Sequence, residues 1–296
     1  MQTREALVDT APSMAGVVVL YRPGTEVLGH MGSYLDQVDV LYALDNSEEP
    51  NATLVRLLEC LPKVRYLANR QNLGVAAALN LGARMAIAEG RQWLLTMDQD
   101  SVATPGMVTK MLECVDEAGV DRVGLVSPFH VQVGGALREP AGRCVPVVTP
   151  MTSGSLVRLE AFEEVGPFLE ELFIDQVDRE FCLRLHMAGW SVVQAGEAKL
   201  SHRVGDVHFH RLPVPMYTSN HPAVRRYYMT RNRFLVGNMY RDRFPDYRRA
   251  ERREVFKDVV KIILHERRKC AKLRMMLRGY IDYRCGRLGP LQSPSE

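Results

Sequence analysis

The run GVVVLY at Gly16–Tyr21 is continuously apolar, and Pro23 and Gly24 end it. An uninterrupted, β-branched run of this length is typical of a strand buried on both faces, as in a parallel sheet. A helix-forming stretch follows at Thr25–Tyr34, and a second apolar run follows at Val40–Leu44. The sequence therefore predicts that the fold begins with a strand–helix–strand unit.

The same alternation continues as far as Met97. Helices are predicted at Thr53–Leu61 and Gly74–Glu89, and strands at Val64–Leu67 and Trp93–Met97. This order predicts an α/β fold with a doubly wound, mostly parallel sheet and right-handed crossovers. Ligands of such sheets bind at the carboxyl ends of the strands. The polar residues at these ends are Tyr21 and Arg22, Asp45 and Asn46, residues 69–74, and Asp98 to Asp100.

The second half of the chain alternates less regularly. Phe129–Pro150 is rich in glycine and proline, which predicts a β-ribbon or loop over the ligand-binding edge. The other expected elements are a helix at Pro105–Glu117, a strand at Val123–Ser127, ordered structure at Thr152–Val157, a helix at Val177–Met187, a strand at Ser191–Gln194, and long helices at Arg225–Tyr240 and Arg248–Arg278.

Charge is unevenly distributed along the chain. The net charge is +3 over 296 residues, yet Arg225–Arg287 holds 20 Lys or Arg against 7 Asp or Glu. We therefore divide the chain into a ligand-binding body at 1–224 and a basic helical extension at 225–296. A basic extension favours attraction to a polyanion, and an anionic membrane surface and nucleic acid are the two candidates.

Composition bounds the class of protein. With 46% hydrophobic and 25% charged residues, the chain can bury a large core, which excludes disorder, collagen and coiled coil. The 6 cysteines are scattered without a CxxC pair, so we expect reduced thiols. Because no run reaches about 18 apolar residues and the first apolar run is too short for a signal sequence, we expect a cytoplasmic protein.

Asp98 and Asp100 follow the predicted strand Trp93–Met97. Two carboxylates at this spacing suit a site in which one binds a sugar or ribose and the other a divalent metal that bridges phosphates. The same pattern also occurs in solvated turns. Its position at a strand end favours the binding interpretation.

Two other strand ends allow both a local and a functional role. Asp45 can form an Asx turn in its Asp-Asn-Ser triplet, or it can accept hydrogen bonds from a nucleotide base or ribose. Asn72 can cap the helix that follows it, and Gly74 would let the backbone approach a diphosphate. For Asn72 and Gly74 the two roles are compatible.

The segment LFIDQVDREFCLR at Leu172–Arg184 places Asp178 at the start of a helix. An acidic residue there complements the helix dipole, but a carboxylate that faces a half-buried cleft can also act as a general base. Asp175 is the alternative for that role. Asp178 would head a buried stripe, and Glu180 would form a surface ion pair with Arg184. The stripe consists of Phe181, Cys182 and Leu185.

His202, His208 and His210 lie in one expected loop, Leu200–Leu212. Because no cysteine cluster or H-E-x-x-H helix accompanies them, we interpret His208 and His210 as structural rather than metal ligands. His202 follows a strand, so we expect it to face the same cleft as Asp100.

Ordered motifs over about Gly16–Leu235 resemble the inverting family-two glycosyltransferases with the A-type nucleotide-binding fold, in particular their bacterial rhamnosyltransferases. The motifs are VVVLYRP, the DNS triplet at Asp45, NRQNLGVAAALNLG, DQDS at Asp98, TSGSLV at Thr152, ELFIDQVDREFCLR, LSHRVGD and RRYYMTRN. A single short motif arises by chance, whereas this ordered set does not.

The resemblance implies which residues bind the donor. Asp45 would bind the nucleotide base, Asn72 and Gly74 would line the nucleotide site, and Asp98 would face the donor. Asp100 would hold Mg²⁺ or Mn²⁺ on the diphosphate. The other residues implied for the donor side are Tyr21 and Arg22 at a strand end, His202 as a second metal or diphosphate ligand, and Arg231 and Asn232 near the leaving group.

The resemblance also implies the acceptor side of the reaction. Ser153 and Gly154 would shape the acceptor site, and Asp178 would be the catalytic base. The wider family has a Glu-Asp pair where this chain has Val177 and Asp178. The role of base therefore falls to one carboxylate, with Asp175 on the acceptor side as the alternative.

The implied activity is inverting, metal-dependent transfer of L-rhamnose from dTDP-L-rhamnose to a hydroxyl of a glycan or lipid-linked acceptor, as in O-antigen or glycolipid synthesis. A galactofuranosyl or hexosyl donor is the alternative within the family.

Two other classes of protein are less consistent with the sequence. A pyrophosphorylase would carry a glycine-rich loop after its first strand, where this chain has YRPG. A noncatalytic membrane- or nucleic-acid-binding protein would leave the acidic residues unexplained. We therefore expect an anionic membrane surface rather than nucleic acid as partner of the extension.

Overall fold

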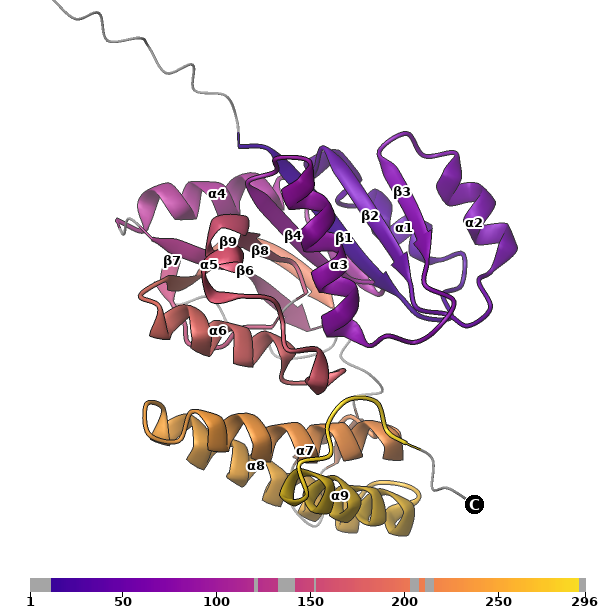
Figure 1. Ribbon diagram of the computed structural model, residues 1–296, viewed down its shortest axis with the longest axis vertical. Helices are drawn as coiled ribbons and strands as arrows, with labels where there is room; N and C mark the ends of the chain where they lie inside the picture. The colour runs from indigo at the N-terminus through magenta and orange to yellow at the C-terminus, as the bar shows by residue number, and fades with distance from the viewer. Residues whose placement is uncertain are drawn as a thin grey trace, which may run out of the picture.

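The computed structural model describes residues 12–119, 122–132, 142–151, 153–202, 208–210 and 216–292. An α/β body with a twisted sheet lies against a layer of three helices from the C-terminal part of the chain (Figure 1). The strands of the body are β1 (Met14–Leu20), β2 (Val40–Asp45), β3 (Val64–Ala68), β4 (Trp93–Asp98), β5 (Ser101–Ala103), β6 (Val123–Gln132), β7 (Cys144–Pro146), β8 (Ser155–Arg158) and β9 (Ser191–His202). A separate pair is formed by β10 (His208–His210) and β11 (Met216–Thr218).

The helices of the body alternate with these strands. They are α1 (Val27–Gly32), α2 (Ala52–Glu59), α3 (Val75–Ala88), α4 (Met107–Glu117), α5 (Leu159–Val165) and α6 (Val177–Met187), with short 3-10 turns at Leu35–Gln37 and Glu170–Leu172. The C-terminal layer consists of α7 (Ala223–Met239), α8 (Pro245–Leu264) and α9 (Lys269–Arg284). The predicted helix Val177–Met187 has the same bounds as α6, whereas α5 was not predicted.

The sheet is mixed and mostly parallel, with the order β3-β2-β1-β4-β8-β6-β9-β5 among the described strands. The β3-β2-β1-β4 half is parallel, as the early alternation predicts. In the other half, β8 is antiparallel to both β4 and β6, and β5 is antiparallel to β9. The α/β class is therefore confirmed, and the antiparallel strands are the feature that the sequence pattern did not indicate.

Both faces of the sheet are covered, which is why β1, β2 and β4 are apolar over almost their whole length. Val18 belongs to a core cluster that also contains residues of α1, α2 and α4. Its neighbour Val17 belongs to a second cluster that contains residues of α3, α5 and α6. Successive side chains of a strand point to opposite faces, so a continuous apolar run supplies both cores at once.

The C-terminal layer differs from the prediction in one respect. A single helix was expected over Arg248–Arg278, but α8 ends at Leu264 and Arg268 adopts a left-handed conformation with φ of 55°. Glu266 lies in this turn, is buried, and pairs with Arg226 and with Lys272, the latter at 2.8 Å. These buried ion pairs turn the chain inward where the apolar pattern alone favours a continuous helix.

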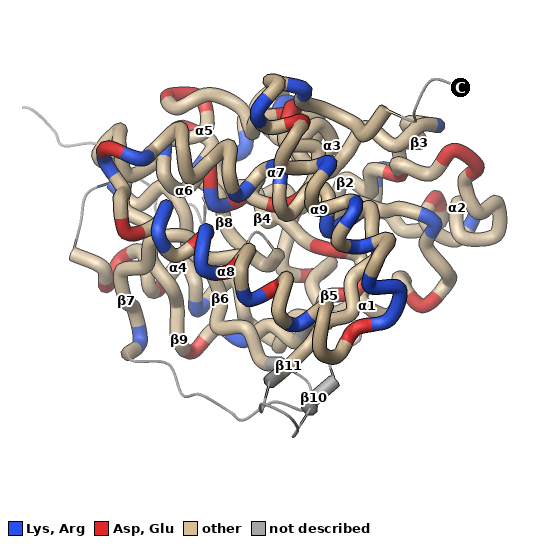
Figure 2. Tube along the Cα trace, turned by 90° about the horizontal axis from the view of Figure 1, so that it is seen from below, with Lys and Arg blue, Asp and Glu red and all other residues tan. Residues whose placement is uncertain are grey.

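Several charged side chains of the extension are buried. Glu251, Asp258, Glu266 and Asp282 are all buried, and each pairs with an arginine. Removing one partner of a buried pair leaves an uncompensated charge, at a cost of about 3–5 kcal/mol. Four of the 7 acidic residues in Arg225–Arg287 are thus buried, and the remaining basic residues dominate the outer surface of the extension. Figure 2 shows this side, with Lys and Arg marked along α8 and α9.

The cysteine prediction requires a correction. Cys114 on α4 and Cys144 on β7 form a disulfide, with their Cα atoms 5.3 Å apart. The pairing of β7 with β9 brings Cys144 beside α4, an approach that sequence spacing does not reveal. The expectation of reduced thiols throughout is therefore wrong for this pair. In the described part of the chain, no helix has the length and apolar character needed to cross a membrane.

Candidate active site

Asp45 ends β2 at the carboxyl edge of the sheet and is buried. One of its carboxylate oxygens accepts a hydrogen bond from the Ser47 amide at 2.8 Å, and the other accepts one from the Tyr66 hydroxyl at 2.8 Å. Burial, followed by this bond to Asp45, raises the pKa of Tyr66. The structure therefore contains the Asx turn, and both carboxylate oxygens have protein partners.

Gly74 begins α3 beside the loop that precedes α6. The side-chain oxygen of Asn72 accepts a hydrogen bond from the Gly74 amide at 3.1 Å, so Asn72 stabilises this turn. Gly74 has a φ of 84°, and a Cβ added to it would lie 2.6 Å from the backbone oxygen of Phe173. Only glycine fits this close approach, which makes the position structural whether or not it also borders a diphosphate.

The turn after β4 carries Asp98 and Asp100, both half-buried. The Asp98 amide donates a hydrogen bond to the Ser153 hydroxyl at 3.1 Å, and that hydroxyl lies 2.8 Å from the Ser101 hydroxyl. The Tyr21 amide, just after β1, donates to the side chain of Gln99 at 2.9 Å. Neighbouring strand ends thus fix the backbone around both carboxylates.

The predicted acceptor residues Ser153 and Gly154 lie directly behind this turn. Ser153 is buried, and its hydroxyl is engaged with the turn residues. Gly154 has a φ of 78°, and an added Cβ would lie 2.8 Å from both Leu200 and Pro128 side-chain atoms. In the structure these two residues support the turn that carries Asp98 and Asp100.

The loop before α6, residues 171–176, has a strained backbone. Phe173, Asp175 and Gln176 have φ values of 65°, 64° and 69°. For non-glycine residues, each such conformation costs about 1–3 kcal/mol and persists only when the surroundings impose it. We call residues 171–176 the acidic loop.

Arg231 and Asn232 of α7 impose the shape of the acidic loop. The Asn232 side-chain amide donates to the carbonyls of Leu172, Ile174 and Asp175 at 2.8, 2.8 and 3.0 Å. Arg231 donates to the carbonyls of Glu171 and Leu172 at 3.0 and 3.1 Å. Both side chains are fully buried. The family resemblance implies a position near the leaving group, whereas the hydrogen bonds of these side chains are to the acidic loop and, for Arg231, also to the Gly289 carbonyl.

Arg225, in the first turn of α7, connects the acidic loop with the turn after β4. Its guanidinium lies 3.0 Å from a carboxylate oxygen of Asp175. The pKa of Arg225 is raised, first by the charge of Asp175 and to a smaller extent by those of Asp98 and Asp100. Carboxylates from two distant segments therefore act on one cation. Arg225 begins the motif RRYYMTRN but is not among the residues predicted for the site.

Asp178 is half-buried in the first turn of α6. One of its oxygens accepts a hydrogen bond from the Arg179 amide at 2.8 Å. Its charge helps to raise the pKa of the Cys182 thiol, after the larger effect of burial, and contributes in the same way at Tyr247. The buried stripe predicted behind Asp178 is present in Phe181, Cys182 and Leu185.

The expected ion pair of Glu180 and Arg184 is present, but its expected position at the surface is wrong. Glu180 is fully buried, lies 2.7 Å from Arg184, and also accepts a hydrogen bond from the Tyr240 hydroxyl at 2.6 Å. Tyr240 follows α7, so the C-terminal layer covers a side of α6 that its own sequence marks as polar. The sequence pattern within α6 cannot show that Tyr240, from another part of the chain, covers Glu180.

The predicted metal ligands are only partly within the described structure. The backbone of His202 pairs with that of Ser101, next to Asp100, but its side chain lies outside the described residues. The same holds for the side chains of His208 and His210, while Thr152 and residues 203–207 are not described. Among the residues that are described, no group of three or more His, Cys, Asp or Glu is arranged to hold a metal. Mg²⁺ usually binds to one or two protein carboxylates together with oxygens of substrate phosphates. The carboxylates of Asp98 and Asp100 nevertheless fit this kind of site.

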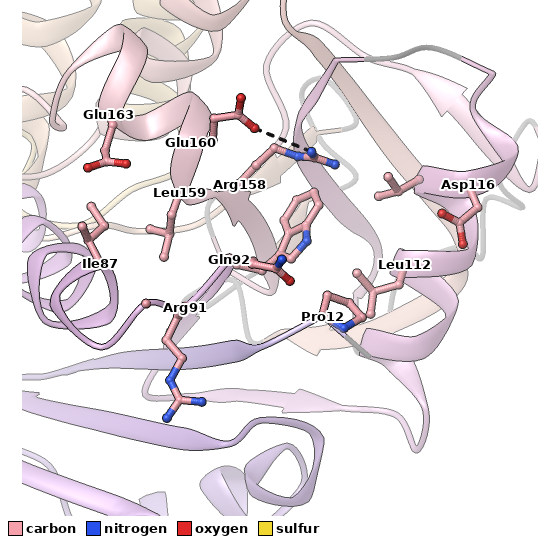
Figure 3. Close-up of a pocket in the computed structure, with 13 residues that line it drawn as sticks. Pro12, Ile87, Arg91, Gln92, Leu112, Asp116, Arg158, Leu159, Glu160 and Glu163 are labelled. Carbon is pink, nitrogen blue, oxygen red and sulfur yellow. Dashed lines mark ion pairs between the residues drawn. The ribbon is translucent and has the colours of Figure 1, made fainter. Parts of the chain in front are cut away.

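A cavity of about 590 Å³ lies at the opposite edge of the sheet (Figure 3). Gln92 and Trp93, at the start of β4, line it together with Glu163, and Arg158 lies 3.9 Å from Glu160 there. Ligands of parallel sheets bind at the carboxyl ends of the strands, and this cavity lies at the amino end of β4. We therefore place the candidate active site at the other edge, around Asp98, Asp100 and Asp175.

Comparison with known protein families and sequences gives a consistent result. The family model "Glycosyl transferase family 2" matches residues 27–145. The chain is 30% identical over 243 residues to dTDP-rhamnosyl transferase RfbF of Shigella flexneri, which covers 74% of this chain and 78% of that protein. It is 25% identical over 248 residues to galactofuranosyltransferase GlfT1 of Mycobacterium tuberculosis, which covers 76% of this chain and 82% of that protein.

Solved structures show the same fold at low sequence identity. GalNAc-T7, crystallised with UDP, GalNAc and Mn²⁺, superimposes with a TM-score of 0.63 at 14% identity, over 83% of this chain and about half (51%) of that one. S. aureus TarS 1–349 superimposes with a TM-score of 0.53 at 12% identity, over 92% of this chain and 80% of that one. At these identities the likeness concerns the fold alone.

Proposed function

Because the chain belongs to glycosyltransferase family 2, we propose that it transfers L-rhamnose from dTDP-L-rhamnose to a hydroxyl of a glycan or lipid-linked acceptor. One observation carries the proposal: Arg225 pairs with Asp175 and is also under the charge of Asp98 and Asp100. Three acidic residues of the predicted site, Asp98, Asp100 and Asp175, act on this one cation, which supports a shared site at the ligand-binding edge. The choice of rhamnose is supported by the 30% identity to a protein named a dTDP-rhamnosyl transferase.

In this proposal the donor lies along the carboxyl ends of the strands. The nucleoside occupies the side of Asp45, next to Tyr21 and Arg22, and the diphosphate lies between Gly74 and the turn after β4. Asp100, with the side chain of His202, would hold Mg²⁺ or Mn²⁺, and Asp98 would face the donor. The metal, when bound, supplies a Lewis acid for the diphosphate oxygens. Arg231 and Asn232 contribute by fixing the acidic loop.

Transfer with inversion needs one base. The acceptor oxygen forms a bond to the anomeric carbon while the bond from that carbon to the diphosphate breaks, and Asp178 takes the hydroxyl proton. A positioned base contributes about 10²- to 10⁴-fold in rate. Asp175 is the alternative base, supported by its ion pair with Arg225 beside the donor carboxylates.

Donor hydrolysis tests the proposal. The purified protein is incubated with dTDP-L-rhamnose, UDP-galactofuranose or UDP-glucose, in Mg²⁺, Mn²⁺ or EDTA, and release of nucleoside diphosphate is measured. We expect metal-dependent release that is fastest with dTDP-L-rhamnose. Faster release from UDP-galactofuranose would favour the second donor, which the likeness to a galactofuranosyltransferase supports. Glu163→Gln, at the opposite edge of the sheet, is the control variant. If neither wild type nor this control released nucleoside diphosphate from any donor, the result would contradict the proposal.

We also propose that the extension binds an anionic membrane surface, where lipid-linked acceptors reside. On α8, Phe256 is 70% exposed and Ile263 is 50% exposed, and exposed Arg252, Arg253 and Lys257 lie among them. Each basic residue near an anionic leaflet contributes about 1 kcal/mol to binding. In liposome flotation we expect binding to vesicles containing phosphatidylglycerol and little binding to neutral vesicles. Equal recovery from both would contradict membrane binding through charge.

A further inference from the structure

We propose that Arg225 is the protein's own counter-charge for the departing diphosphate, and that it leaves Asp175 to bind the donor. This inference rests on the proposed function. It makes the helical extension part of the active site, because Arg225 belongs to α7 whereas Asp175 belongs to the body. It also makes the Arg225–Asp175 ion pair a resting contact that the donor replaces.

The position of Arg225 suits such an exchange. Its side chain is 44% exposed, while that of Asp175 is only 17% exposed. The cation therefore borders solvent, whereas its partner is held in the strained acidic loop. A guanidinium presents donors in a planar fork that matches phosphate oxygens, so the new pair can be bidentate.

The charges around Arg225 give the exchange a driving force. Asp175, Asp98 and Asp100 all act on its guanidinium, so three carboxylates lie in this part of the site. A nucleoside diphosphate adds further negative charge to that region and is repelled by the same carboxylates. Binding therefore needs a mobile cation in addition to the metal, and Arg225 is already in the field of each carboxylate.

The exchange also affects Asp175. In the described structure its second carboxylate oxygen is buried and has no hydrogen-bond partner. If the carboxylate also loses its ion pair, a new hydrogen-bond donor to this buried oxygen is favourable, since an unpaired buried polar atom costs free energy. An acceptor hydroxyl supplies such a donor. The exchange thus couples the two substrates, and it predicts that the donor binds before the acceptor.

Binding of dTDP with Mg²⁺, measured by calorimetry, tests the exchange in four proteins: wild type, Arg225→Ala, Asp175→Asn and the double variant. Arg225→Ala should weaken binding at least about tenfold, as expected for loss of a charge-assisted hydrogen bond. Asp175→Asn should tighten binding about fivefold, because Arg225 is then unpaired before dTDP arrives. In the double variant that gain should vanish.

Controls separate the exchange from simple repulsion and from misfolding. Arg84→Ala removes an exposed arginine on α3 and should bind dTDP like wild type. Arg225→Lys keeps the charge without the planar fork and should fall between wild type and Arg225→Ala. A gain from Asp175→Asn that persists in the Arg225→Ala background would show that Asp175 merely repels dTDP, and would overturn the exchange.

Failure of this inference differs from failure of the proposed function. If wild type binds dTDP and hydrolyses a nucleotide sugar while Arg225→Ala does both equally well, only the role of Arg225 is overturned. If wild type neither binds dTDP nor hydrolyses any donor, the proposed function itself fails. With a working donor, Arg225→Ala should also lower kcat for hydrolysis about 10²- to 10³-fold, the usual effect of removing one group that stabilises developing charge.

Discussion

The side-chain amide nitrogen of Asn232 lies 3.0 Å from the backbone carbonyl oxygen of Asp175, and α7 thereby holds the acidic loop of the body. The same amide reaches the carbonyls of Leu172 and Ile174. One side chain of the extension thus satisfies carbonyl groups of three loop residues. The layer of helices below the sheet is therefore a support of the candidate active site.

Replacing Asn232 by alanine should destabilise the protein and reduce its activity. Buried carbonyl groups that lose their donors cost free energy, and we expect a loss of about 2–4 kcal/mol in the free energy of unfolding. Urea unfolding measures this loss, and donor hydrolysis measures the effect of a relaxed loop. Asn238→Ala, half-buried on the same helix, serves as the matched control. Equal stability of the two variants would show that the loop does not depend on Asn232.

Asp178→Asn tests the base. The amide keeps the size of the side chain but cannot take a proton, so we expect kcat for glycosyl transfer to fall about 10²- to 10⁴-fold. Binding of dTDP and the unfolding transition should stay near wild type. Glu163→Gln, an exposed carboxylate at the opposite edge, is the control. Normal transfer by Asp178→Asn would move the role of base to Asp175.

Asp100→Ala tests the metal site. If this carboxylate holds the divalent ion, the variant should lose the stimulation of dTDP binding by Mg²⁺ or Mn²⁺, while its weak binding in EDTA should match that of wild type. A divalent ion bridges carboxylate and phosphate oxygens, so the effect is conditional on metal. Calorimetry with and without EDTA measures it. Metal stimulation of wild-type size in the variant would place the ion elsewhere.

His221 makes stability depend on pH. Burial first, and then the charges of Arg225 and Arg226, lower its pKa from 6.5 to about 4. The folded pKa is below the unfolded one, so the unfolded chain binds the proton first as pH falls. Above about pH 6.5 His221 is neutral in both states and does not destabilise the folded protein. Between about pH 6.5 and pH 4 the folded state progressively loses stability, because the unfolded chain binds the proton more readily.

A variant isolates this effect from that of the many carboxylates. His221→Asn cannot titrate, so the difference in unfolding free energy between wild type and variant should change between about pH 7.5 and about pH 4.5, with wild type losing more. Denaturant titrations at both pH values give the difference. A constant difference would mean that His221 is protonated equally readily in the folded and unfolded chains.

Much of the fold could be predicted because it depends on residues that lie close together in the sequence. The apolar run at Gly16–Tyr21 required a strand covered on both sides, and Val17 and Val18 do enter two different cores. The bounds of α6 followed from spacing within its own residues. The antiparallel β8 could not be predicted, because short apolar runs do not encode direction. The turn at Glu266 was missed because its partners, Arg226 and Lys272, lie in other helices.

The candidate site divides in the same way. Its carboxylates could be predicted because Asp98, Asp100, Asp175 and Asp178 lie in motifs next to a strand end or a helix start. The contacts between the segments that carry them could not be predicted. Arg225 and Asp175 are separated by 50 residues, and Glu180 is buried only because Tyr240 covers it. These contacts require that α7 and the residue after it pack against α6 and the loop before it.

The sequence by itself determined the α/β class, the family and the edge of the sheet where chemistry is expected, because periodicity and short motifs depend on neighbouring residues. Only the tertiary structure decided which charge faces which, how the acidic loop is held, and that two cysteines meet. Those outcomes depend on distances between segments far apart in the chain, and electrostatic and hydrogen-bond energies change steeply over a few ångströms.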